Sequence, residues 1–179
     1  MPPGPPGPPP LPEAQVAEAL QKLRVPAMVF LVGLAVQVIT YLTATAWSLG
    51  IVVLLAQTVA SSPDTLPAMA MFGAGALFNI LSFIALGIMA VGGVRMLRAR
   101  GYGWALGSAI TQIAWGIVHA AVLFYSTFGL GCLLGPIELV VVLITGTVAI
   151  AVLLNRSVIR AFDAVEAHPE LLEVGSARD

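Results

Sequence analysis

Long stretches without a charged residue dominate this chain. None of the 39 residues from Val25 to Pro63 is charged, and the 30 residues from Thr65 to Val94 form a second such stretch. A helix needs about 20 apolar residues to cross a bilayer, so the first stretch is longer than one crossing requires. It contains no Asn-Gly or Pro-Gly turn that would divide it. The pattern therefore predicts one long helix over 26–56 and a second membrane span over 67–94.

Two further apolar segments follow a short basic turn. Residues 102–125 and 136–154 are each long enough for one crossing. The residues between them, 126–136, are apolar and interrupted by glycines, which indicates a tight loop folded against the helices. The predicted fold class is all-α: a polytopic membrane protein in which residues 25–155 form a bundle of four transmembrane helices with short loops.

The two ends of the chain differ from this membrane domain. Residues 1–12 are almost entirely proline and glycine, which predicts a disordered tail. Residues 13–24 predict an amphipathic cytoplasmic helix that lies on the membrane surface, or alternatively a solvated extension of the first span. Their apolar stripe is formed by Val16, Leu20 and Leu23. Residues 156–179 are polar and predict a cytoplasmic tail that begins as a short helix.

Composition supports the membrane assignment and excludes other classes. Apolar residues make up 59% of the chain and charged residues 9%, whereas about 25% of a soluble domain is charged. The lipid bilayer is therefore the first predicted partner. Eight basic residues against nine acidic ones leave no polycationic surface, so nucleic-acid binding is not expected. A single cysteine excludes a disulfide framework within the chain and any CxxC motif.

The distribution of basic residues predicts the topology. Each one precedes the first span, separates the second from the third, or follows the fourth; they are Lys22, Arg24, Arg95, Arg98, Arg100, Arg156, Arg160 and Arg178. In a four-span protein all three of these regions lie on the same side of the membrane. The positive-inside rule makes that side the cytoplasm. We expect a multi-pass protein of the cell (inner) membrane with both termini in the cytoplasm.

Three polar residues inside the spans form a candidate intramembrane site. Glu138 follows Pro136 by two residues, which places it in the first turn of the fourth span, near the outer interface. There its carboxylate would complement the helix dipole, and the alternative is an ion or proton site. His119 is expected to form hydrogen bonds between helices, and it pairs with Glu138 if both lie at the same level. Asn79 is an amide of the kind that bonds across helices.

Glycines suggest where the helices pack. Gly103 and Gly107 have the small-xxx-small spacing at the start of the third span, which permits two helices to approach closely. They predict a packing face for the hairpin of the second and third spans. Gly131 and Gly135 repeat the spacing in the predicted loop, where turn formation is the expected role.

The inventory of side chains argues against an enzyme. The spans contain one histidine, one glutamate and no aspartate, so they lack the aspartate pair and the HExxH motif of intramembrane proteases. No P-loop and no GxGxxG loop is present. We therefore predict no catalytic residues, no cofactor and no metal site.

Several motifs resemble a family of small, uncharacterised bacterial four-span membrane proteins. They are the run from Gly92 to Ile110 (GGVRMLRARGYGWALGSAI), the element Leu133 to Ile137 (LLGPI), and the ending that joins Val152–Asn155 to Val158–Phe162. The resemblance covers about residues 25 to 162 and implies a four-span fold and a membrane location, with no activity attached. The chain departs from the family in carrying Cys132 alone and in placing Glu138 after the proline.

Two functional hypotheses follow. The first is a non-enzymatic structural or interaction subunit of a membrane assembly, which associates with itself or with other membrane proteins. The second is a small channel or transporter subunit that uses Glu138, His119 and Asn79. The sequence favours the first, because so few intramembrane charges are available to line a path.

Overall fold

The computed structural model describes residues 12–59, 62–126 and 130–169. Over these residues the chain is helical, without a strand. The elements are α1 (Glu13–Thr58), a 3-10 turn (Pro63–Thr65), α2 (Leu66–Leu97), α3 (Tyr102–Ser126), α4 (Leu130–Leu153) and α5 (Arg156–Ala167). The helices α1 to α4 are long and apolar enough to cross a membrane. The predicted all-α, four-helix architecture is confirmed.

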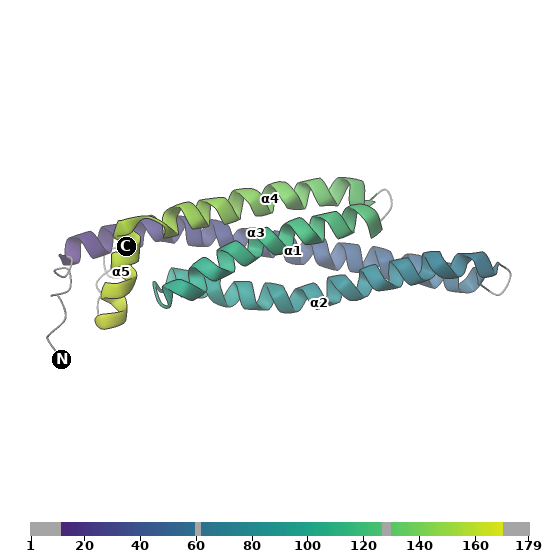
Figure 1. The fold of residues 1–179 in the computed structure, drawn as a ribbon, viewed down its shortest axis with the longest axis horizontal. Helices are drawn as coiled ribbons and strands as arrows, with labels where there is room; N and C mark the ends of the chain where they lie inside the picture. The colour runs from purple at the N-terminus through teal and green to yellow at the C-terminus, as the bar shows by residue number, and fades with distance from the viewer. Residues whose placement is uncertain (1–11, 60–61, 127–129, 170–179) are drawn as a thin grey trace, which may run out of the picture.

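The four long helices run alternately up and down (Figure 1). Helix α1 packs against α2 and α4, and α3 packs against the other sides of α2 and α4, so the helices follow one another around the bundle. The short turn between α2 and α3 supports this hairpin, because Gly101 adopts a φ of 64°, in the left-handed region where glycine is favoured. Arg95 lies 5.2 Å from the ring centre of Trp104 across the same turn.

Helix α1 is longer than the predicted first span. It begins at Glu13 and continues without interruption through Pro26 to Thr58. Residues 13–24 are thus part of α1 rather than a separate helix. The alternative of an extension of the first span describes them better. The predicted tail over 1–12 lies, apart from Pro12, outside the described residues.

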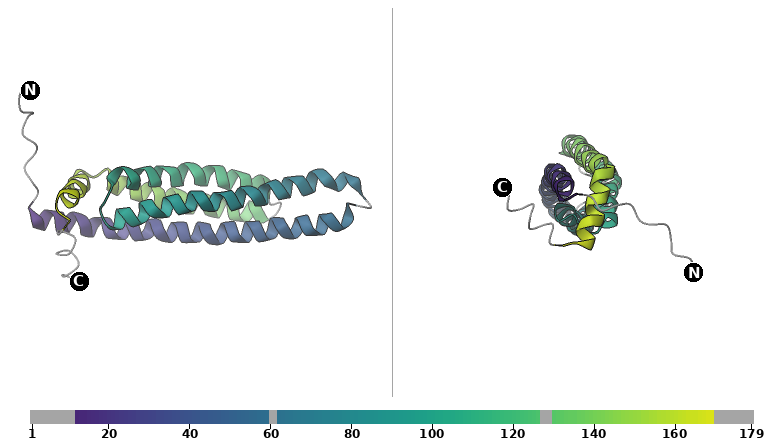
Figure 2. Two further views of the ribbon diagram at one scale, coloured as in Figure 1. Left: turned by 90° about the horizontal axis from the view of Figure 1, so that it is seen from below. Right: turned by 90° about the vertical axis from the view of Figure 1, so that its left-hand side faces the viewer.

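Helix α5 packs across the end of the bundle where α1 begins (Figure 2). Phe162 of α5 is buried and meets Tyr102 at a ring-centre distance of 5.5 Å. The apolar stripe of α1 completes this contact region, since Val16 and Leu23 are buried in the same core cluster. The start of the predicted C-terminal tail is therefore a packed helix. Residues 170–179 lie outside the described part of the chain.

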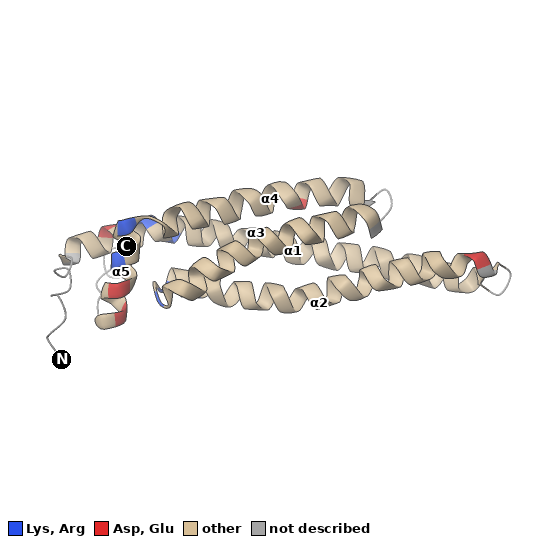
Figure 3. Ribbon diagram, viewed as in Figure 1, with Lys and Arg blue, Asp and Glu red and all other residues tan. Residues whose placement is uncertain are grey.

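The described lysine and arginine residues gather at the end of the bundle that carries α5 (Figure 3). They belong to the first part of α1, the last turn of α2, the turn between α2 and α3, and α5. The opposite end of the α1–α2 hairpin carries Asp64. This hairpin extends past the ends of α3 and α4 (Figures 1 and 2). The fold thus places the basic groups at one level, as the four-span topology requires.

Candidate intramembrane polar site

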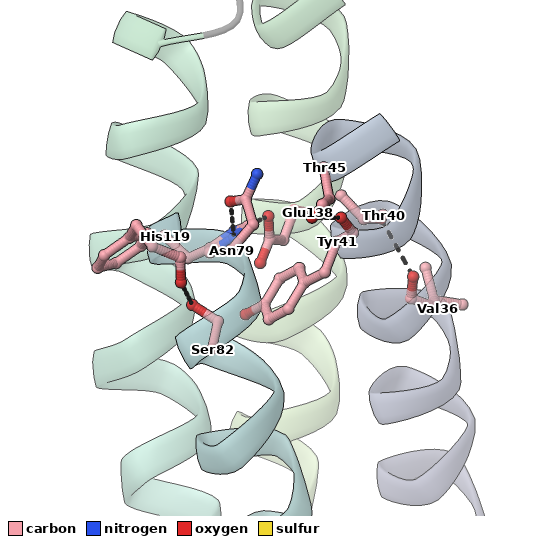
Figure 4. A network of polar contacts seen from close by, with 9 residues as sticks. Val36, Thr40, Tyr41, Thr45, Asn79, Ser82, His119 and Glu138 are labelled. Atoms are coloured by element: carbon pink, nitrogen blue, oxygen red, sulfur yellow. Dashed lines mark hydrogen bonds and ion pairs between the residues drawn. The ribbon is translucent and has the colours of Figure 1, made fainter. Parts of the chain in front are cut away.

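His119 on α3 lies at the centre of a buried polar network. Its Nδ1 atom is 2.9 Å from Oε2 of Glu138 on α4, and its Nε2 atom is 2.9 Å from Oδ1 of Asn79 on α2. None of the three side chains is more than 1% exposed. The structure therefore brings together all three polar residues that the sequence singles out, and it joins three helices through them (Figure 4).

Tyr41 adds the fourth helix to this network. Its ring stacks on the imidazole of His119, with ring centres 3.7 Å apart, and its side chain extends from α1 toward Glu138 (Figure 4). Phe78 also stacks on His119, at 5.7 Å. Sequence reasoning missed Tyr41. The available signal was its position four residues after Gln37, which puts both polar groups on one face of α1. We call Tyr41, Asn79, His119 and Glu138 the ionisable layer.

The predicted depth of Glu138 is wrong. Helix α4 begins at Leu130, not at Pro136, so Glu138 lies eight residues inside it, about 12 Å at about 1.5 Å per residue. Residues 130–136, predicted as part of a loop, are helical. A proline inside a transmembrane helix is tolerated where neighbouring groups compensate for the lost backbone bond. Glu138 is consequently no helix-start carboxylate, and its hydrogen-bond partner is the side chain of His119.

The hydrogen-bond geometry restricts where protons can reside. The roles of the two ring nitrogens depend on the tautomer of His119; with the carbonyl oxygen of Asn79 facing Nε2, Nε2 carries a hydrogen and donates it. The 2.9 Å contact between Nδ1 and Glu138 then requires a second proton. That proton belongs to an imidazolium facing a carboxylate, or to a carboxylic acid facing a neutral imidazole. In both forms the pair is neutral overall and holds one proton between its two groups.

The ionisable layer has unused hydrogen-bonding capacity. The hydroxyl of Tyr41, Oε1 of Glu138 and Nδ2 of Asn79 are buried without a hydrogen-bond partner. Buried polar groups of this kind are normally paired. Two of the three atoms are donors in their usual states and one is an acceptor. The cluster can therefore rearrange its hydrogen bonds without recruiting further residues.

A second polar cluster lies one to two helical turns closer to the basic end. Nε2 of Gln112 is 3.4 Å from Oε1 of Gln37 and donates to the hydroxyl of Thr145 at 3.2 Å. Thr145 in turn donates to the carbonyl oxygen of Val141 at 2.8 Å. These groups are neutral amides and a hydroxyl, and they connect α1, α3 and α4. We call Gln37, Gln112 and Thr145 the amide layer.

The glycine prediction needs a correction. Gly103 and Gly107 face outward, and a Cβ atom added to either would meet nothing within 4 Å. The α2–α3 hairpin packs instead through Gly92, where an added Cβ would overlap Ser108. Gly135, expected in a turn, is buried in α4. A Cβ atom added to it would lie 3.0 Å from the carbonyl oxygen of Ala120. The prediction that Gly103 and Gly107 form the packing face of this hairpin is therefore wrong, because the sequence does not show which face of a helix turns inward.

The described residues contain no group of three or more His, Cys, Asp or Glu side chains that could hold a metal ion. No family model, no curated protein and no solved structure matches this chain. The resemblance to bacterial four-span proteins consequently stays a prediction. Functional inference depends on the chemistry of the ionisable layer.

Proposed function

We propose that this chain is a non-enzymatic, multi-pass protein of the inner membrane, with both termini in the cytoplasm, that binds and releases a proton in its core. The observation that carries the proposal is the contact between His119 and Glu138, two ionisable side chains at 0–1% exposure and 2.9 Å apart. Charged residues within a membrane are costly and are characteristic of ion and proton pathways. The contact therefore supports the channel and transporter hypothesis over the structural subunit that the sequence favours.

The site has two charge states that differ by one proton. In the first, His119 and Glu138 share a proton and are neutral together. In the second, Glu138 is ionised and His119 is neutral, with its single hydrogen on Nδ1 facing the carboxylate. Nε2 then becomes a hydrogen-bond acceptor. The carbonyl oxygen of Asn79 is also an acceptor, so the two atoms cannot form a hydrogen bond. The Asn79 side chain would rotate to donate from Nδ2, so that proton release changes the contact between α2 and α3.

The experiment is a titration of His119 in the purified protein. With ¹⁵N-labelled histidine in a neutral detergent, nitrogen shifts distinguish the imidazolium and the two neutral tautomers. We expect the His119 signals to change between acidic and alkaline buffers, and Asn79→Leu to alter the tautomer. His168 in the C-terminal region serves as the exposed reference. Nitrogen shifts of His119 that stay constant across the whole range would refute proton exchange at this site.

Proton movement is tested separately in liposomes that contain a pH-sensitive dye. We expect a proton flux with the parent protein and its loss with Glu138→Gln, which keeps the volume of the side chain but not its acidity. Gln57→Glu is a matched control, because it alters charge at an exposed position near the end of α1. Titration without flux would assign the proton site to regulation of the bundle rather than to transport.

A second candidate is a structural subunit of a membrane assembly. It is favoured by the fact that each of the four long helices contributes one residue to the ionisable layer. A polar cluster shared in this way can fix the register of a bundle without any transport. In that case Glu138→Gln would change stability, while co-purifying membrane proteins or self-association would identify the assembly.

A further inference from the structure

An open groove of about 510 Å³ lies between α1 and α4 on the outside of the bundle. Arg24 stands at its basic end, Met28, Val32 and Val36 line it along α1, and Val141 and Thr145 line it along α4. Val32 is 61% exposed and Met28 53%, so the groove is accessible from the surrounding bilayer. Its volume falls within the range of about 300–1,000 Å³ that ligand sites occupy.

The length of the groove matches one leaflet. From Arg24 to Val36 is a rise of about 18 Å along α1, at about 1.5 Å per residue. Half the hydrocarbon core of a bilayer is about 15 Å. A single acyl chain that enters from the basic side therefore fits the groove from end to end.

The polarity of the groove is that of a lipid tail site with a charged entrance. Between its ends the lining consists of apolar side chains and Gly33. The hydroxyl of Thr145, beside Gly33, is occupied, since it donates to Val141 and accepts from Gln112. Gly33 lets α1 and α4 approach closely there, since an added Cβ would lie 2.7 Å from the Thr145 methyl group. A polar headgroup consequently finds a complementary group only at the Arg24 end.

We propose that this groove binds one acyl chain of an anionic phospholipid, with the headgroup phosphate at Arg24 and the tail extending to Val36 and Val141. Guanidinium groups bind phosphate through charge-assisted hydrogen bonds. Basic pockets between transmembrane helices on the cytoplasmic side are known to select anionic headgroups. The proposal requires a bilayer around the bundle but is independent of proton binding at His119.

Native mass spectrometry of the full chain, released from a neutral detergent, tests the site. With equal amounts of phosphatidylglycerol and phosphatidylcholine added, we expect one phosphatidylglycerol to be retained preferentially. Arg24→Gln should reduce that preference about fivefold, the effect of one basic residue near an anionic headgroup. Val32→Trp should reduce retention of both lipids, because the indole would fill the groove.

Matched controls separate the groove from general surface effects. Arg98→Gln removes a basic residue that does not line the groove, and Ile84→Trp adds an indole to an exposed face of α2. Both should bind like the parent. Glycerol 3-phosphate, which has the headgroup but no acyl chain, should fail to displace the lipid. Any one of three outcomes would overturn the proposal. They are equal retention of the two lipids, equal effects of Arg24→Gln and Arg98→Gln, and displacement of the lipid by glycerol 3-phosphate.

A photoreactive acyl chain provides a second measurement that does not depend on variants. Phosphatidylglycerol with a diazirine on its tail should label peptides that contain residues 25–36 of α1 and 141–145 of α4. Labelling spread evenly over all four long helices would contradict a defined site.

Discussion

Two polar layers cross the core of this bundle, and they differ in kind. The ionisable layer holds an acid and a base at 2.9 Å, whereas the amide layer holds neutral groups at 3.2 and 3.4 Å. Both are buried, and both join α1, α3 and α4. Loss of one partner in the ionisable layer leaves a buried charge, while loss of one partner in the amide layer leaves only an unpaired dipole. The two layers should therefore respond very differently to the same substitution.

The largest effect is expected for His119→Leu. This change keeps an apolar side chain of similar size in the core but leaves Glu138 without its base. Breaking a buried charge pair on one side costs about 3–5 kcal/mol. The free energy of unfolding, measured by thermal or denaturant unfolding in detergent, should fall by that amount.

The double variant His119→Leu with Glu138→Leu is the control for this prediction. It removes both partners, so no charge stays buried, and most of the lost stability should return. A double variant as unstable as the single one would mean that the loss comes from packing around the imidazole, including its stacking on Tyr41.

An intermediate effect is expected for Gly116→Val, which acts between the two layers. Gly116 lies between Gln112 and His119 on α3, and an added Cβ would come 2.5 Å from Val142 on α4. Overpacking of this type costs about 1–3 kcal/mol. Gly87→Val is the matched control, because a Cβ there meets nothing within 4 Å. Equal melting temperatures of the two variants would show that α3 and α4 can move apart between the layers without a loss of stability.

A smaller effect is expected for Gln112→Leu in the amide layer. Hydrogen bonds between membrane helices contribute about 0.6 kcal/mol on average. The unfolding free energy should fall by about that amount, and the ¹⁵N shifts of His119 should stay as in the parent. A loss as large as that of His119→Leu would remove the distinction between the layers.

The smallest effect is expected for Gly107→Leu, outside both layers. Gly107 faces outward and its substitution touches no other helix of the same chain, so the change in stability should stay within about 0.5 kcal/mol. The melting temperature and the oligomeric state in detergent are to be measured together. A large loss that accompanies dissociation of an oligomer would reveal that a second copy packs on this face.

The candidate site was predictable because ionisable residues are rare in the apolar spans. Glu138 and His119 are the ionisable residues that stand out in apolar spans, and the cost of burying such groups makes them candidates wherever they occur. The contact between them was predicted only on the condition that both residues lie at the same depth. Tyr41 was missed: its spacing of four residues from Gln37 puts both on one face of a helix, but it does not show that the ring stacks on His119.

Two errors, the loop predicted over 126–136 and the depth of Glu138, share one physical cause. Glycine and proline interrupt helices in water, which is why 126–136 was predicted to be a loop. In an apolar surrounding the backbone must satisfy its own hydrogen bonds, so the helix continues through such residues, as α4 does through Gly135 and Pro136. Because α4 begins at Leu130 and not at Pro136, Glu138 lies in the core and not at the predicted interface.

The sequence by itself determined the number of long helices, their order and the side on which the basic groups gather, because charge is excluded from apolar spans and hydrophobic length sets a crossing. The tertiary structure alone decided which face of each helix turns inward. That choice depends on packing between helices and not on hydrophobicity, which is similar on all faces of a membrane helix. It placed Gly103 and Gly107 outside, and it placed Glu138, His119 and Asn79 together inside.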